Sequence, residues 1–360
     1  MKQFNIALLP GDGVGEEVTR VASSILQSAG KKFEVIFNFK EALCGGAAID
    51  AVDQPLPEET LELCKNSDAV LFGAVGGPKW DDLEREKRPE QAILGLRKGL
   101  DLYANLRPAV MFDSLVDSSS LKPEIVRGLD ILVLREGVSG IYFGKPQHIE
   151  DISPDEQRAV DTMVYHSSEI RRIVKLGFEL AAVRKKKLCS VDKENVLYNS
   201  RLWRKVAIEV GADFPDIELS HMYVDNASMQ LIRNPLQFDV VVTGNMFGDI
   251  LSDAASMLTG SIGMLASANL GDGGFGMFEP VHGSAPDIAG QDKANPVAAI
   301  MSAAMLCRYA LKLPKVAEVI ETSVSQALSE GYRTIDIHTP GSKKMSCSDM
   351  GSVILDRVGE

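Results

Sequence analysis

The sequence predicts an α/β protein in two lobes. Short β-rich runs alternate with stretches of helical periodicity along most of the 360 residues, which is the pattern of helices packed on a sheet. Apolar residues make up 45% of the chain, enough for a sizeable core at this length. Several runs are apolar throughout, as strands buried on both faces are. No internal repeat or long linker marks the boundary between the lobes.

The first unit of the chain is expected to be a strand, a turn and a helix. The strand NIALLP at 5–10 leads into a Gly-rich turn, after which apolar side chains recur at helical spacing from Val18 to Ala29. Gly30 is expected to end this helix. Residues 33–39 then alternate as in a half-buried strand. Fully buried strands are predicted at 69–75, 131–136, 187–191 and 239–244.

The composition argues against several classes of function. The formal net charge of −12 is unsuited to a sequence-independent nucleic-acid surface, because phosphate binding needs concentrated Lys and Arg. The chain has no apolar run of membrane-spanning length and no secretory signal at its start. Its five cysteines lie far apart without a C-x-x-C pair, so their spacing predicts neither a disulfide framework nor a zinc site. We expect a cytoplasmic protein that binds neither nucleic acid nor a membrane.

Two Gly-rich turns follow predicted strands. The turn GDGVGEEV at 11–18 has the spacing G-x-G-x-G, which differs from the dinucleotide fingerprint, and no acidic residue is placed convincingly at the end of the next strand to hold a ribose. This favours a tight structural turn over direct phosphate binding. The second turn, GAVGGPKW at 73–80, is expected to let a flat ligand approach the backbone.

Three arginines are candidates for binding an anionic substrate: Arg97, Arg107 and Arg135. A guanidinium grips a carboxylate through two parallel hydrogen bonds, so a small diacid is best held by several arginines. Each one alone is more commonly a surface ion-pair partner. Arg107 and Arg135, however, end or interrupt apolar strand-like runs, where a charge is costly unless it meets an anion.

Three aspartates are candidates for a metal site. Asp249 and Asp253 lie four residues apart and so share one face of a predicted helix. Together with Asp225 they make an oxygen-rich site suited to Mg²⁺ or Mn²⁺. The alternative for the pair is a helix cap with an exposed acid one turn later. The five histidines show no ligand spacing, so a histidine-bound transition metal is not expected.

The candidates for proton transfer are Tyr142 in SGIYFG and Lys193 in SVDKEN. A tyrosine in such a loop is usually a packed aromatic, and a lysine between acids is usually solvated. A lysine drawn into a dry cleft nevertheless loses its proton readily enough to act as a base. A long loop of small residues at 279–296 precedes a helix expected near Asn295. It is either a plain surface loop or a loop whose backbone N–H groups bind adenosine and phosphate.

Taken together, the motifs resemble those of the β-decarboxylating isocitrate/isopropylmalate dehydrogenase family, essentially from end to end. The matching segments are, in order, GDGVGEEV, GAVGGPKWDDL, LRKGLDLYANLRP, LREGVSGIYFG, SVDKENVL, HMYVDNASMQL, TGNMFGDILSD and EPVHGSAPDIAG. The resemblance implies an α/β, two-domain fold distinct from the Rossmann type. Residues 1–102 plus 260–360 would form the cofactor-side domain and 103–259 the second domain. An arm after Tyr142 would help to form a homodimer.

The resemblance also implies a substrate. Arg97, Arg107 and Arg135 would hold the malate carboxylates. Ile93 and Leu94 stand where isocitrate enzymes carry polar groups for a third carboxylate, and these two aliphatic side chains suit an isopropyl group. The expected reaction is the NAD-dependent oxidative decarboxylation of (2R,3S)-3-isopropylmalate to 4-methyl-2-oxopentanoate and CO₂ in leucine biosynthesis. A tartrate or malate enzyme of the same family is the alternative.

The remaining roles implied by the resemblance are shared between two subunits. One Mg²⁺ or Mn²⁺ would be bound by Asp249 and Asp253 of one subunit and by Asp225 of the partner subunit. The same ion would bind the 2-hydroxyl of the substrate, so Asp225 would also lie next to the substrate. Lys193 of the partner subunit would remove the hydroxyl proton. Tyr142 would protonate the carbon left after CO₂ departs.

The implied cofactor is NAD. Asn195 matches the residue near the nicotinamide end. The Asp287 carboxylate is suited to the ribose hydroxyls and would repel a 2′-phosphate, which disfavours NADP. The expected NAD contacts are Gly77, Pro78, Glu90, Asn195, His282, Gly283, Ser284, Ala285, Pro286, Asp287, Ile288 and Asn295.

Overall fold

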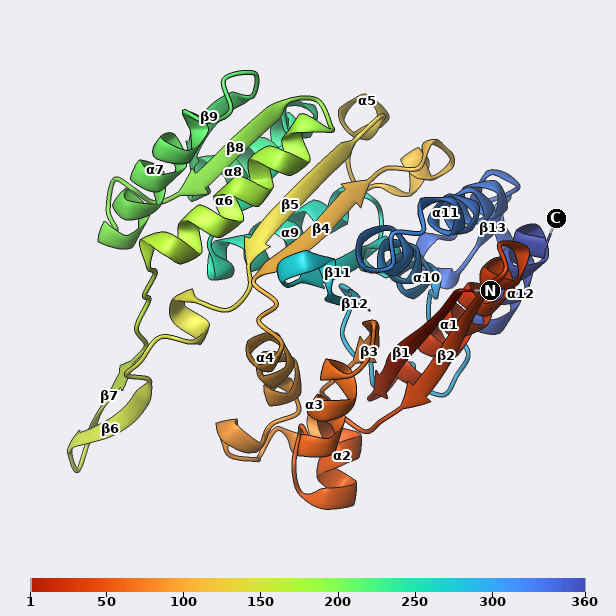
Figure 1. Ribbon diagram of the computed structural model, residues 1–360, viewed down its shortest axis with the longest axis horizontal. Helices are drawn as coiled ribbons and strands as arrows, with labels where there is room; N and C mark the ends of the chain where they lie inside the picture. Colours follow the sequence, from red (N-terminus) through yellow and green to blue (C-terminus); the bar gives the residue numbers. More distant parts are fainter. Residues whose placement is uncertain (1, 360) are drawn as a thin grey trace.

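One ten-stranded mixed sheet runs through the whole molecule (Figure 1). The computed structural model describes residues 2–359. Along the sheet the strands follow the order β2 (Val35–Glu41), β1 (Lys2–Gly11), β3 (Ala69–Ala74), β12 (Gly276–Pro280), β11 (Ala266–Leu270), β4 (Ala104–Val110), β5 (Asp130–Glu136), β10 (Val240–Thr243), β8 (Lys187–Asp192) and β9 (Glu218–Tyr223). The α/β prediction is confirmed, and all four fully buried strands predicted from the sequence are present as β3, β5, β8 and β10.

Helices cover both faces of the sheet (Figure 1). Helices from the two chain ends pack together, α1 against α10, α11 and α12, while α6 packs on α7 and α8 on α9. The helices are α1 (Gly15–Lys32), α2 (Gly45–Val52), α3 (Glu58–Lys65), α4 (Glu90–Gly99), α5 (Pro123–Val126), α6 (Ser167–Ala182), α7 (Tyr198–Gly211), α8 (Val224–Arg233), α9 (Asn245–Leu258), α10 (Val297–Met305), α11 (Pro314–Ser329) and α12 (Cys347–Gly359). No helix in the described chain is long and apolar enough to cross a membrane.

The strand directions bring the candidate residues to one edge of the sheet. Strands β5, β10, β8 and β9 are mutually parallel, so their carboxyl ends share an edge, where ligand sites of α/β sheets usually lie. Arg135, Lys193 and Asp225 lie at or just after the ends of β5, β8 and β9, and α9 follows β10. Strand β4 runs antiparallel to β5, which places its first residues at the same edge.

The first helix does not end where the sequence predicts. Helix α1 continues through Gly30 to Lys32, so the expectation that Gly30 ends the helix is wrong. A Cβ at Gly30 would lie 2.7 Å from Cε2 of Phe37. The glycine is therefore required for the close approach of α1 to β2 rather than for a helix stop.

The first Gly-rich turn has a structural role, as favoured from the sequence. The carboxylate of Asp12 accepts hydrogen bonds from the backbone N–H of Gly46, Ala47 and Gly76, each at 2.8 Å. The N–H of Val14 donates to the carbonyl of Ser284 at 2.8 Å. The turn thus joins the second Gly-rich turn to the loop at 281–296.

A two-stranded hairpin, β6 (His148–Ser153) and β7 (Glu156–Val160), projects from the body of the molecule after Tyr142 (Figure 1). Its side chains are mostly exposed, including Ile149 at 70% and Ile152 at 53%. An isolated hairpin is only marginally stable in water. The hairpin therefore has the form expected of an arm that is covered by another chain.

Candidate active site

Two of the candidate arginines lie side by side on neighbouring strands. Arg107 on β4 and Arg135 on β5 are both buried, with 7% and 2% of their surface exposed. In the β4–β5 register, Arg135 is opposite Asn105, two residues before Arg107, so both guanidinium groups lie on the same face of the sheet. The Nε of Arg107 donates to Oδ1 of Asn105 at 2.8 Å, which fixes its orientation.

Helix α9 brings the predicted acid pair to these arginines. Nη1 of Arg107 lies 3.4 Å from Oδ1 of Asp249 and 2.9 Å from Oδ1 of Asp253. Arg135 also forms an ion pair with Asp249. At the start of the helix, Oδ1 of Asn245 accepts hydrogen bonds from Nε and Nη2 of Arg135 at 3.0 and 2.7 Å. The arginines and acids, far apart in sequence, therefore form one charged cluster.

Tyr142 belongs to the same cluster. Its hydroxyl donates to Oδ2 of Asp249 at 3.0 Å, and the guanidinium of Arg135 lies 5.6 Å from the centre of its ring. Burial, followed by the negative charge of Asp249, raises the pKa of the Tyr142 phenol. Tyr142 therefore holds its proton at neutral pH, as a group that is to donate a proton must.

Arg97 completes a set of three buried cations. It lies on α4 with 4% of its surface exposed, and Nη2 pairs with Oε1 of Glu279 at 3.3 Å. Its buried Nε has no acceptor among residues 2–359, and such an orphaned donor is costly unless a ligand satisfies it. Burial and the charges of Arg97 and Arg107 lower the pKa of the Arg135 guanidinium. Three cations this close favour the binding of an anion.

The predicted side pocket lies next to this cluster. Ile93 and Leu94 are half-buried on α4, four and three residues before Arg97, so they share its helix face. Leu94 and Tyr142 line the same cavity. This cavity is also lined by the charged side chains of Arg85, Glu86 and Lys98. Leu94 therefore lies near Tyr142, and the role of Ile93 and Leu94 as an apolar side pocket stays a prediction.

Lys193 and Asp225 form a separate pair in the described chain. Nζ of Lys193 lies 2.7 Å from Oδ2 of Asp225, and this contact lowers the pKa of the Asp225 carboxyl. Neither side chain forms an ion pair or hydrogen bond with Asp249, Asp253 or Tyr142 within residues 2–359. One chain thus contains two half-sites, one around α9 and one at the ends of β8 and β9.

The oxygen-rich chemistry of the acids fits a hard divalent cation. Asp249 and Asp253 offer carboxylate oxygens on one helix face, the ligand type that Mg²⁺ and Mn²⁺ prefer. Burial raises the pKa of Asp253, and the nearby Arg107 opposes this shift. Asp225 does not join the pair within the described part of a single chain. The predicted site of three carboxylates is therefore not formed within one described chain.

The predicted cofactor residues Gly77, Pro78 and Glu90 lie on or beside the second Gly-rich turn. Gly76 and Gly77 have positive φ values of 109° and 157°, and a Cβ at Gly76 would lie 3.0 Å from Oε1 of Glu90. Pro78 opens the short helical turn that follows. Gly76 is buried, Gly77 is half-buried and Pro78 is exposed, and the contact of this turn with a flat ligand stays a prediction.

The second cofactor segment is the loop at 281–296. In this loop, the carbonyl of Ser284 accepts a hydrogen bond from the N–H of Val14. Burial lowers the pKa of the His282 imidazole. The exposed residues are Gly283, Pro286 and Asp287, and the half-buried ones are Ala285 and Ile288. Asn295 is 6% exposed, and its side chain donates to Asp336 at 2.9 Å and accepts from the N–H of Val297 at 3.0 Å.

The Asn295 side chain accepts a hydrogen bond from Val297, the first residue of α10, and so helps to hold the start of this helix. Its contact with NAD stays a prediction. Asn195, by contrast, is exposed on the loop that carries Lys193.

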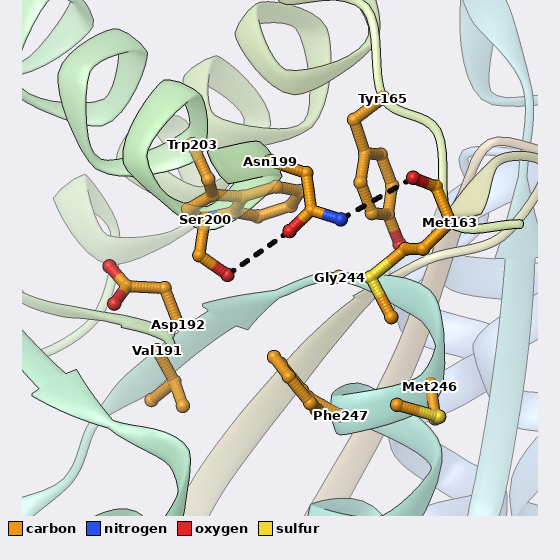
Figure 2. Close-up of a pocket in the computed structure, with 10 residues that line it drawn as sticks. All are labelled: Met163, Tyr165, Val191, Asp192, Asn199, Ser200, Trp203, Gly244, Met246 and Phe247. Atoms are coloured by element: carbon orange, nitrogen blue, oxygen red, sulfur yellow. Dashed lines mark hydrogen bonds between the residues drawn. The ribbon is translucent and has the colours of Figure 1, made fainter. Parts of the chain in front are cut away.

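The small cavity in Figure 2 lies beside the start of α9, since Gly244, Met246 and Phe247 are among its lining residues. Tyr165 accepts a hydrogen bond from the N–H of Asn245 at 2.7 Å and packs edge-on against Trp203, with ring centres 5.6 Å apart. Asn199 lies between the carbonyl of Met163 and the hydroxyl of Ser200 (Figure 2). The hydrogen bond from Asn245 to Tyr165 helps to hold the first turn of α9 in place.

Glu136 is a buried acid that sequence reasoning missed. It has no exposed surface, and its carboxylate accepts the N–H of Val138 at 3.0 Å and of Ser139 at 2.8 Å. These bonds hold the loop that leads from Arg135 to Tyr142. Its position at the end of an apolar strand, next to Arg135, is the only sequence signal for this role.

The pH dependence of folding tests the state of Glu136. Burial raises its pKa from 4.5 to about 7, so the folded protein holds an extra proton in this window and stability is lost as the pH rises through it. Glu136→Gln should make the fall in unfolding free energy between about pH 5 and pH 7 shallower by up to about 1.4 kcal/mol per pH unit. Urea unfolding at several pH values measures this slope, with Glu156→Gln on the exposed hairpin as control. An unchanged slope would contradict the assignment.

Comparison with known proteins identifies the family of the chain. Residues 5–354 match the family model described as isocitrate/isopropylmalate dehydrogenase. The chain belongs to this family of dehydrogenases, and the resemblance inferred from the sequence motifs is confirmed.

Within the family, the chain is similar to 3-isopropylmalate dehydrogenases. It is 57% identical over 357 residues to the 3-isopropylmalate dehydrogenase of Synechocystis sp., covering 99% of each chain. It is 56% identical over 357 residues to 3-isopropylmalate dehydrogenase 1, chloroplastic, of Arabidopsis thaliana, covering 99% of this chain and 87% of that one. The crystal structure of isocitrate dehydrogenase from Methylococcus capsulatus matches with a TM-score of 0.88 at 32% identity over 100% of both chains. The family's fold is thereby confirmed.

Proposed function

We propose that the protein catalyses the NAD-dependent oxidative decarboxylation of (2R,3S)-3-isopropylmalate to 4-methyl-2-oxopentanoate and CO₂, a step of leucine biosynthesis. The observation that carries the proposal is the convergence of Arg107 and Arg135 on the α9 carboxylates and Tyr142, with the buried Arg97 close enough for its charge to act on Arg135. The similarity to 3-isopropylmalate dehydrogenases along nearly the whole chain supports the choice of substrate.

The arginines bind the two carboxylates of the substrate. In the structure, Asp249 and Asp253 neutralise Arg107 and Arg135. A bound diacid provides the arginines with other anionic partners, which leaves the aspartates available to hold a cation. Ile93 and Leu94 then face the isopropyl group, and their lack of polar groups disfavours a third carboxylate.

The metal site draws on both half-sites. Asp249 and Asp253, with Asp225 of the partner subunit, would hold Mg²⁺ or Mn²⁺. When bound, the ion stabilises negative charge on the substrate oxygen, both as the hydroxyl is deprotonated and as carboxylate is lost. Lys193 of the partner subunit removes the hydroxyl proton. Tyr142 then donates its phenolic proton to the carbon from which CO₂ has left.

A homodimer explains the apolar surface around the two half-sites. Helices α8 and α9 pack together and expose Met229, Ile232, Ile250 and Met257 to between 54% and 60%. Exposed apolar patches of this kind mark protein interfaces. Because a two-fold interface brings the same surface of both subunits together, it would place α8 of one subunit near α9 of the other. The exposed hairpin adds a second contact.

The cofactor site and the two-domain division are part of the same proposal. NAD would lie on the turn at Gly77 and the loop at 281–296, on the domain formed by residues 1–102 plus 260–360. Strands β2, β1, β3, β12 and β11 come from these residues, and the other five strands of the sheet come from 103–259. This separation of the strands supports the boundaries. The composition favours a cytoplasmic location.

Cofactor preference provides a test at Asp287. This residue is exposed, and no hydrogen bond to its carboxylate is formed within residues 2–359, so it is available for ribose hydroxyls. Asp287→Asn should raise the kcat/KM ratio for NADP over NAD by at least about tenfold, because the repulsion of a 2′-phosphate is removed. The KM for isopropylmalate serves as the control and should not change. An unaltered cofactor ratio would exclude this role for Asp287.

Substrate identity is tested by an NAD reduction assay. Isopropylmalate, malate, tartrate and isocitrate are compared with and without a chelator. The proposal predicts the highest kcat/KM for isopropylmalate and loss of activity on chelation. A preference for tartrate or malate would favour the sister activity, and undiminished activity with chelator would exclude the metal role.

A further inference from the structure

A second cluster of ligand-type side chains lies away from the α9 carboxylates. Glu17 in the first turn of α1, Asp292 in the loop at 281–296 and Cys347 at the start of α12 each offer one ligand atom, and these atoms lie within 4.8 Å of one another. We propose that these three side chains form a second metal site that binds a thiophilic divalent cation such as Zn²⁺.

An unsatisfied carboxylate oxygen indicates that a ligand belongs here. Glu17 is 7% exposed, and its Oε2 is buried without a hydrogen-bond partner among the described residues. Its other oxygen accepts the N–H of Gly290, so the carboxylate is held in place. A buried, unpaired carboxylate oxygen carries a substantial desolvation cost, which a bound cation would remove.

The surrounding hydrogen bonds orient the other two ligands. Asp292 accepts the N–H of Ser348 at 2.8 Å and its hydroxyl at 2.6 Å, and the carbonyl of Asp292 accepts the N–H of Cys347 at 2.9 Å. Hydrogen bonds of this kind to the side chains that bind the ion are typical of metal sites. The carboxylates of Glu17 and Asp292 and the backbone of Cys347 are therefore held in place before any ion binds.

The sulfur lies in a strongly negative environment. Cys347 is 1% exposed, and burial, followed by the charges of Glu17 and Asp292, raises the pKa of its thiol to about 12. Arg20 opposes this shift from one side. A divalent cation would reverse the preference by binding the thiolate directly.

The ligand set selects the class of metal. One thiolate and two carboxylates favour Zn²⁺ or Co²⁺ over Mg²⁺, which prefers oxygen ligands alone. Three protein ligands leave a fourth position for water. The bound ion would tie α1, α12 and the loop at 281–296 together. The absence of zinc-type spacing in the sequence is no obstacle, because the fold joins ligands about 50 to 330 residues apart.

Titration of the chelator-treated full-length protein with Co²⁺ tests the proposal. One equivalent per chain should produce a near-ultraviolet charge-transfer band from thiolate to Co²⁺, which oxygen ligands at α9 do not give. Cys347→Ser and Glu17→Gln should abolish or strongly weaken the band. The matched controls are Cys307→Ser, at another buried cysteine, and Asp249→Asn, and both should retain it.

The outcomes separate this site from the proposed active site. No band in the wild-type protein, or a band that survives in Cys347→Ser, would overturn the second site whatever the enzyme activity is. Zn²⁺ should also raise the thermal unfolding midpoint of the wild type by more than that of Glu17→Gln, which keeps only the proposed site at α9. An equal shift in both would likewise overturn the proposal.

Discussion

Replacing Asp249 by asparagine is expected to lower metal-dependent NADH formation by at least about 1,000-fold, or about 4 kcal/mol of transition-state stabilisation. Asp249 is the central residue of the half-site around α9, because it contacts Arg107, Arg135 and Tyr142. Asparagine retains its shape but removes the charge that holds a cation. Steady-state kcat/KM at saturating Mg²⁺ or Mn²⁺ measures the effect.

The fold of this variant must be checked, because two buried arginines lose part of their ion pairing. Circular dichroism and the unfolding midpoint should show a folded chain, since Asn245, Asn105 and Asp253 still accept hydrogen bonds from the arginines. Asp272→Asn, at an exposed acid outside the site, is the matched control and should retain full activity. Turnover of Asp249→Asn near the wild-type rate would refute the metal assignment.

Replacing Lys193 by methionine is expected to lower kcat by about 10²- to 10⁴-fold, the usual contribution of a general base. Lys193 donates to Asp225 at 2.7 Å and its side chain is 24% exposed, so the variant removes a positioned amine without opening a core cavity. Steady-state kcat with isopropylmalate at saturating NAD and metal measures the effect.

A surface lysine provides the comparison for this variant. Lys205 is exposed on the neighbouring helix α7, and Lys205→Met should retain the wild-type rate. If Lys193→Met also retained it, Lys193 would not be the base.

Much of the charged cluster was predictable from the sequence, because charge inside an apolar run is a strong local signal. Arg107 and Arg135 interrupt runs that must be buried, and Asp249 and Asp253 share a helix face whatever the rest of the fold does. The strands were predictable for the same reason, since their apolar runs leave no exposed face. Local patterns of this kind can be recognised in the sequence without knowledge of the fold.

Other features depend on contacts between distant segments and were not predictable. The role of Asn245 arises only when α9 meets β5, and the partner of Arg97 is Glu279, 182 residues away. The residue type of Gly30 predicts the end of a helix, but Gly30 lies inside α1. A glycine is needed there because the ring of Phe37 packs against it. Such pairings depend on the register of the sheet and on helix packing, which spacing along the chain does not encode.

The central claim is that each active site combines α9 of one chain with Lys193 and Asp225 of the other. Asp249→Asn and Lys193→Met chains carrying different affinity tags can be co-expressed and the mixed dimer purified. In that dimer one site carries both substitutions and the other carries none, so the claim predicts about half of the wild-type activity from two nearly inactive parents. A mixed dimer as inactive as its parents would contradict it.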